Sequence, residues 1–180
     1  MAITTITTIT AKGPSAEKMK KTLALLIALL TAAAVFGCAA PKKQTVSMFD
    51  LSQAMLAAYG EADSMAYASS ADADPADKLR YVSEMDYDKA ESFFISYAKD
   101  GKGNADEIVV IAVKDAADAS EAVDSLKAHI DRRISLYSTY DPARVKDLEA
   151  AEVFSFEQYA VLVVADNAEA IVNAFYDFVK

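Results

Sequence analysis

Apolar positions recur along this chain with two different spacings, which predict helices and strands in separate stretches. A spacing of three to four residues, as on one face of a helix, predicts helices over residues 48–59 and from about 119 to 140. Gly60 follows the first helix as a stop signal, and residues 140–142 break the second. A third helix is predicted near the C-terminal end, with four apolar residues facing inward: Ile171, Val172, Phe175 and Val179.

Polar residues at the starts of the last two helices resemble a capping box, in which a side-chain acceptor is followed three residues later by Glu. Segments 118–121 and 166–169 both have this pattern, so we expect their side chains to cap the helices. Pro142 suits the first turn of a further, short helix over residues 143–150.

Two pairs of segments have the patterns of β-hairpins. Phe93, Ile95 and Tyr97 alternate with Ser92 and Ser96, and residues 108–113 are continuously apolar, which is usual for a central strand. The Gly-containing segment 100–104 joins them. A second, tighter hairpin is predicted from residues 153–156 and 159–165.

The order of these elements indicates the fold class. Residues 61–77 are rich in Ala, Ser and Asp around Pro75, which is typical of a loop, and a short element is expected near 78–85. The remaining elements follow one another as hairpin, helix, hairpin, helix. We therefore predict an α+β fold, in which an antiparallel sheet of about four strands has helices packed on one face.

The stretch 19–38 has the three parts of a secretion signal. Two lysines precede an uncharged apolar run, and a small residue precedes the only cysteine. The sequence at the end of the run resembles the lipobox of bacterial lipoproteins, in which the cysteine receives acyl chains such as palmitate. The lipobox residues are Val35, Phe36 and Gly37, and the predicted attachment site is Cys38.

Two acyl chains suffice for stable attachment, so we expect the protein to be anchored on the extracytoplasmic face of the cell membrane. An uncleaved membrane helix over residues 22–40 is the alternative, since this stretch has 19 residues and no charge. We divide the chain into an extension outside the natural signal (1–18), a signal peptide (19–37), a lipidated cysteine with its tether (38–47) and one domain (48–180).

Charge narrows the range of partners. The first 37 residues contain four lysines and one glutamate, so their removal leaves 143 residues and takes the formal net charge from −9 to −12. An acidic domain is repelled by nucleic acid and by anionic lipid headgroups. We therefore expect no nucleic-acid partner, and a domain that stands off the membrane on its tether. With its one cysteine acylated, the protein has no disulfide.

Several segments resemble a known family. They are residues 105–108, with the sequence Ala-Asp-Glu-Ile, Arg133, residues 140–142, and residues 159–164, which begin with Tyr. In this order they resemble the domain of unknown function 4358 family, found in lipoproteins of Gram-positive bacteria. The resemblance implies an extracytoplasmic domain and assigns no residue a role.

Few residues suggest catalysis or metal binding. His129 is the only histidine, no nucleophile-elbow sequence is present, and we expect this side chain on the solvated side of its helix. Two acidic clusters lack the EF-hand register and are expected to be solvated turns, so we predict no metal and no cofactor. The clusters are Asp72, Asp74 and Asp77, and Asp100, Asn104, Asp106 and Glu107.

The one basic position in this acidic domain is a candidate for partner binding. It consists of Arg132 and Arg133 with Tyr137 and Tyr140, and paired guanidinium donors could hold a carboxylate or phosphate. The alternative is that Arg133 pairs with a neighbouring carboxylate and fixes the helix end.

We conclude from the sequence that the chain is most consistent with a non-catalytic interaction or accessory domain at the cell surface, with a protein or cell-wall partner. The alternative is a small hydrolase that uses Asp and Glu on cell-envelope material, which requires a cleft with two carboxylates. A two-lobed solute-binding subunit would need more than 143 residues.

Overall fold

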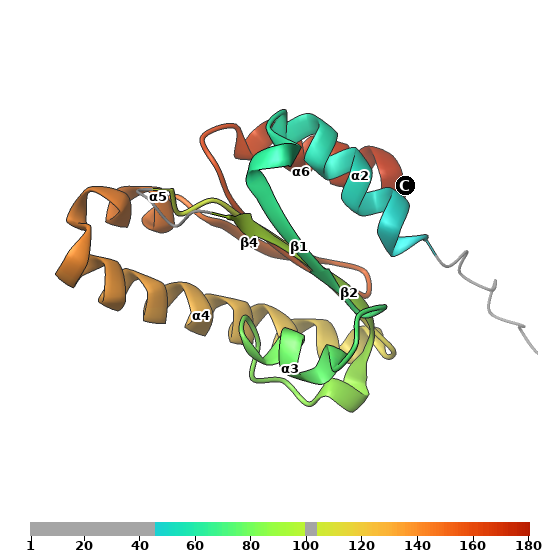
Figure 1. The fold of residues 1–180 in the computed structure, drawn as a ribbon. Helices are drawn as coiled ribbons and strands as arrows, with labels where there is room; N and C mark the ends of the chain where they lie inside the picture. Colours follow the sequence, from blue (N-terminus) through green and yellow to red (C-terminus); the bar gives the residue numbers. More distant parts are fainter. Residues whose placement is uncertain (1–45, 100–103) are drawn as a thin grey trace, which may run out of the picture. The chain divides into compact units, whose positions relative to one another are not determined.

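One antiparallel sheet of five strands organises the computed structural model, which describes residues 46–99 and 104–180 (Figure 1). The spatial order is β1-β2-β3-β5-β4, so β3 is central. This confirms the α+β fold, with five strands instead of about four. The strands are β1 (Met65–Ser69), β2 (Ala90–Ala98), β3 (Glu107–Val113), β4 (Glu152–Phe156) and β5 (Tyr159–Val164).

The additional strand, β1, lies within the stretch predicted to be a loop, and that prediction was wrong. β1 pairs with β2 from Met65 opposite Ala98 to Ser69 opposite Phe94. Its sequence, Met-Ala-Tyr-Ala-Ser, contains no β-branched residue and gives little local preference for a strand. Pairing with β2 and burial of Met65, Ala68 and Ser69 stabilise it instead.

In the described part of the chain, five helices surround the sheet. They are α2 (Met48–Tyr59), α3 (Pro75–Arg80), α4 (Ala119–Tyr140), α5 (Val145–Glu149) and α6 (Ala168–Val179), with single 3-10 turns at Ala62–Ser64, Tyr87–Lys89, Ala116–Asp118 and Pro142–Arg144. α2 has the predicted bounds, because Gly60 takes a left-handed φ of 92° and its N–H donates to the carbonyl of Leu56. No helix in the described ranges is long and apolar enough to cross a membrane.

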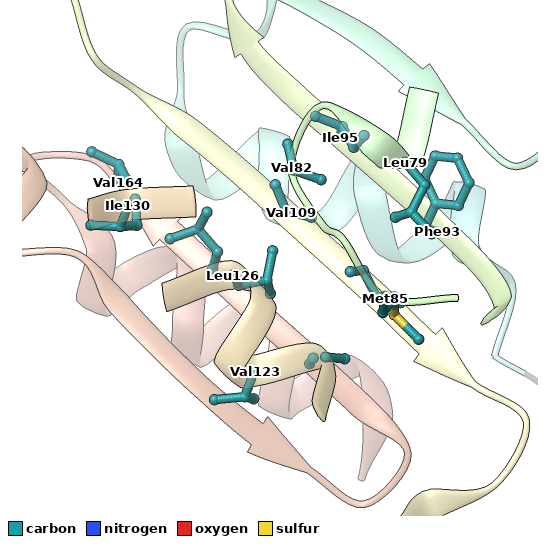
Figure 2. Packing of buried hydrophobic residues seen from close by; sticks show 14 of the residues in the cluster. Leu79, Val82, Met85, Phe93, Ile95, Val109, Val123, Leu126, Ile130 and Val164 are labelled. Atoms are coloured by element: carbon teal, nitrogen blue, oxygen red, sulfur yellow. The ribbon is translucent and has the colours of Figure 1, made fainter. Parts of the chain in front are cut away.

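The helices cover both faces of the sheet, whereas the sequence predicted cover on one. Every residue of β3 and β5 is buried, so side chains of both faces need a partner. On one face, Phe93, Ile95 and Val109 pack with α3 and α4 (Figure 2). On the other face, Phe94 and Val110, whose side chains point to the opposite side of the same strands, pack with α2 and α6.

The predicted helix caps do not form. Asp118 makes no side-chain cap and instead pairs with Lys89 at 3.1 Å. Asn167 precedes α6 without capping it, and its amide donates to the carbonyls of Ala58 at 3.0 Å and Tyr59 at 3.3 Å. Both side chains therefore connect separate elements, which local sequence cannot reveal.

Candidate functional site

Three charged or polar side chains meet between the start of β3 and the middle of α4. Glu107 Oε2 lies 2.8 Å from His129 Nε2 and accepts a hydrogen bond of 2.9 Å from Arg133 Nη1. Arg133 Nη2 also donates to the carbonyl of Ala105 at 2.9 Å. Side-chain exposure is 7% for Glu107, 11% for His129 and 17% for Arg133, so this network is largely withdrawn from water.

The prediction that His129 lies on the solvated side of its helix was wrong. His129 is three residues after Leu126 and four before Arg133, so all three face the sheet. The sequence contained two signals for this network. One is the i, i+4 spacing of His129 and Arg133 on one helix, and the other is a glutamate at the start of an otherwise apolar strand.

A cavity of about 580 Å³ lies beside this network. Its wall consists of residues from β1, β2, β3, α3 and α4, and from the segments that follow β1, follow α3 and precede β3. Three exposed tyrosines belong to it: Tyr67, Tyr81 and Tyr97. The other lining residues are Ala68, Asp72, Lys78, Val82, Ile95, Ala98, Asn104, Asp106, Glu107, His129, Arg133 and Tyr137.

The charged groups of the cavity differ in how they are paired. Asp72 Oδ2 accepts from the backbone N–H of Ser69 at 3.0 Å, and Asp106 Oδ2 accepts from the hydroxyl of Tyr59 at 2.7 Å. Like Glu107, both carboxylates are therefore held by donors of the protein. Lys78, Asp72 and Asp106 make no ion pair with another described residue. The two carboxylates keep their hydrogen bonds from neutral donors, whereas the Lys78 ammonium has no described partner and can donate to a ligand.

Tyr59 connects this cavity to the other face of the sheet, because it ends α2 and binds Asp106. Burial raises the pKa of Tyr59, and the hydrogen bond to the Asp106 carboxylate raises it further. The neutral phenol is thus the form that the fold stabilises.

The structure separates the four residues of the predicted partner-binding position. Arg133 and Tyr137 line the cavity, with the guanidinium carbon 5.6 Å from the centre of the Tyr137 ring. Arg132 instead pairs with Glu84 at 3.0 Å on the exposed surface. Tyr140 packs its ring 4.8 Å from that of Tyr137, and the hydrogen bond between them raises the pKa of Tyr140.

Arg133 does pair with a carboxylate, as the alternative interpretation predicted. Its partner lies on β3, so the pair joins α4 to the sheet and does not fix the helix end. Arg133 is two turns before that end.

Within residues 46–99 and 104–180, no group of three or more His, Cys, Asp or Glu side chains could hold a metal ion. Asp77 pairs with Arg80 at 3.0 Å instead of joining a cluster with Asp72. The lipobox, Cys38 and Asp100 lie outside the described residues. The hydrolase alternative stays a prediction, with Asp72, Asp106 and Glu107 as the carboxylates of the cavity.

Comparison with known proteins gives a match to a family model. The model described as "Domain of unknown function (DUF4358)" matches residues 62–165, whereas no curated protein and no solved structure matches the chain. The match includes every residue of the cavity lining and excludes α2 and α6. Because more than half of the sequence is matched, this chain belongs to the DUF4358 family.

Proposed function

We propose that this protein is a lipid-anchored, extracytoplasmic binding domain without catalysis, and that the cavity between α3, α4 and the sheet is its ligand site. The cavity carries the proposal, because its volume of about 580 Å³ lies in the range of about 300–1,000 Å³ that is usual for ligand pockets. Exposed tyrosines and a few fixed polar groups are also the usual lining of such sites.

The buried network supports a positioning role more than a chemical one. Both donors to Glu107 end on the same oxygen, and Arg133 uses a further N–H on the Ala105 carbonyl. These bonds hold α4 against β3 and give the cavity a rigid polar wall. A rigid wall lowers the entropy that a binding site loses when it is occupied.

The chemistry of the lining favours a ligand with an anionic group on an apolar or ring-bearing body. Lys78 provides an ammonium that pairs with no other described residue, and Arg133 has five N–H groups, of which two bind described residues. Tyr67, Tyr81 and Tyr97 provide flat apolar surface with hydroxyl groups. A carboxylate of a surface protein or of cell-wall material would fit these donors.

Cross-linking in living cells tests the cavity even though its ligand is unidentified. A photoreactive phenylalanine analogue is placed at position 81 or 97 of the full chain, and at Leu136 as a control. Leu136 is exposed on α4 but does not line the cavity. We expect the same adduct from positions 81 and 97 and its absence at 136, and Lys78→Ala should reduce its yield. Absence of a shared adduct from the two cavity positions would overturn the ligand site.

The anchor is tested separately by metabolic labelling with an alkyne analogue of palmitate. The proposal rests here on residues 35–38 of the sequence, and it expects label on the full chain that disappears in Cys38→Ala. A labelled Cys38→Ala variant, or an unlabelled parent chain, would contradict lipidation at this cysteine.

A further inference from the structure

Two phenylalanines are exposed on the helical layer formed by α2 and α6. Phe49 is 63% exposed and Phe178 is 38% exposed, whereas the other phenylalanines in the described ranges are buried or half-buried. A phenylalanine has no polar group that could interact with water. Exposure of two such side chains on one helical layer suggests a surface that contacts something apolar.

The two side chains lie at the same end of the layer. Asn167, just before α6, donates to the carbonyls of Ala58 and Tyr59 at the end of α2. Each helix has 12 residues and they pack side by side, so they run antiparallel. The start of α2 therefore lies beside the end of α6, where Figure 1 also places the C-terminus.

The residues around the start of α2 and the end of α6 are mostly apolar, and their charged side chains carry no net positive charge. Val46, Met48 and Val179 are half-buried there. The neighbouring charged side chains are those of Asp50, Asp177 and Lys180, and the Lys180 ammonium lies 5.1 Å from the centre of the Tyr176 ring. Attraction to anionic headgroups therefore cannot drive a contact at this end, but burial of apolar surface can.

The covalent chain places this end of the domain nearest to the predicted anchor. Val46 is eight positions after Cys38, and a fully extended chain of that length spans at most about 29 Å. Attachment at Cys38 thus confines the start of α2 to the neighbourhood of the bilayer. A contact too weak to form between separate molecules then becomes intramolecular and is favoured by the effective concentration.

We propose that the end of the α2–α6 layer docks on the lipid bilayer and inserts Phe49 and Phe178 among the acyl chains near the headgroups. This inference rests on the lipid anchor of the proposed function. It revises the expectation that the acidic domain stands off the membrane, because the docking end is apolar although the domain is acidic. The cavity, on the α3–α4 face of the sheet, stays accessible in this orientation.

Tryptophan fluorescence tests the docking, because the chain contains no tryptophan. Phe49→Trp, Phe178→Trp and the control Leu136→Trp are each made in the full, lipidated chain and reconstituted into phosphatidylcholine vesicles. Leu136 is 58% exposed, on the opposite helical layer. Lipids brominated on the acyl chains should quench positions 49 and 178 about twofold, since interfacial side chains insert about 5–10 Å, and should leave position 136 unchanged. High salt should not alter the quenching.

Three results would overturn the docking surface. Equal quenching at the three positions would mean that no end of the domain is preferred. Blue-shifted but unquenched emission at positions 49 and 178 would mean that a second copy of the chain covers them. Loss of quenching in high salt would mean that charge drives the contact. Mass spectrometry of the same samples separates these outcomes from failure of the anchor, since a free Cys38 thiol would contradict the anchor itself.

Discussion

Helices cover the two faces of the sheet to different extents. On the α2–α6 face, two helices of equal length cover the strands, and an aromatic cluster fills the space beneath them. On the α3–α4 face, one helix of 22 residues and one of six leave the cavity over the ends of β1 and β2. The first face therefore contributes mainly stability, and the second face combines packing with a polar network and an accessible site.

The difference shows how a binding site arises where helices cover a sheet face only in part. Phe175 alone contacts three aromatic rings of β4 and β5, with centroid distances of 5.7 Å to Phe154, 6.2 Å to Phe156 and 5.8 Å to Tyr159. On the α3–α4 face, the polar network of Glu107, His129 and Arg133 lies beside the cavity, where the other face has aromatic contacts. Substitutions on the two faces should consequently destabilise the protein for different reasons: loss of apolar packing on the α2–α6 face, and a buried charge without its partner on the α3–α4 face.

The largest effect is expected from Phe175→Ala. This ring is completely buried, so its removal should lower the free energy of unfolding by about 3–5 kcal/mol. Phe178→Ala, on the same helix and exposed, should change it by less than about 0.5 kcal/mol. Denaturant unfolding of the full chain measures both, and similar values for the two variants would contradict the assignment of Phe175 to the core.

Removal of the Glu107 carboxylate tests the buried network on the α3–α4 face. Glu107→Leu leaves Arg133 and His129 buried without their carboxylate partner and should destabilise the protein by about 3–5 kcal/mol. The double variant Glu107→Leu/Arg133→Leu should recover the part of this loss that comes from the buried guanidinium, because two apolar side chains can replace a buried pair. Glu84→Leu is the matched control, since its pair with Arg132 is exposed and contributes about 0–1 kcal/mol. A double variant that is less stable than Glu107→Leu would mean that the pair itself stabilises the fold.

Tyr59→Phe tests the connection between the faces through its dependence on pH. The phenol donates to Asp106, so its loss should cost about 1.5–3 kcal/mol at neutral pH. The folded state raises the pKa of Tyr59 from 10.0, so this stabilisation is complete below pH 10.0 and is lost as the pH rises through the higher folded value. The unfolding free energies of parent and variant should therefore converge in alkali. A constant difference across this range would contradict the raised pKa.

Among the four single substitutions that are not controls, Asn167→Ala should give the smallest effect. The side chain joins the start of α6 to the end of α2 but is exposed, so we expect a loss of about 0.5–1.5 kcal/mol. Asn173→Ala provides the control, because Asn173 is exposed in the middle of α6. Hydrogen exchange should show faster opening at the junction of α2 and α6 in the first variant alone. Equal exchange in both variants would exclude a role for Asn167 in holding the helices together.

The predictable elements are those whose signal lies within a few residues. The bounds of α2 follow from its apolar spacing and from Gly60, and the central position of β3 follows from its unbroken apolar run. β1 has no such signal, because Ala and Ser make up most of it, and only pairing with β2 makes it a strand. The same limit applies to the predicted caps, whose side chains prefer partners on other elements.

The candidate site could be predicted only in part. The sequence predicts Arg133 as part of the one basic position in an acidic domain, with Tyr137 close to it on the helix, and both line the cavity. Arg132 is adjacent to Arg133, but adjacent residues on a helix point about 100° apart. Tyr140 is the last residue of α4 and packs on Tyr137 without lining the cavity. Lys78, Tyr81 and Tyr97 gave no local sign of belonging together, since α3 and β2 meet only in the folded chain.

The sequence alone determined the α+β class, both hairpins, the long helix and the family resemblance, because periodicity, turn residues and motifs are local properties. Only the tertiary structure decided that helices cover both faces, that His129 is buried against Glu107 and that a cavity opens beside Arg133. The reason is physical: a side chain's burial and partners depend on which distant segments pack against it, and that packing is a property of the whole chain.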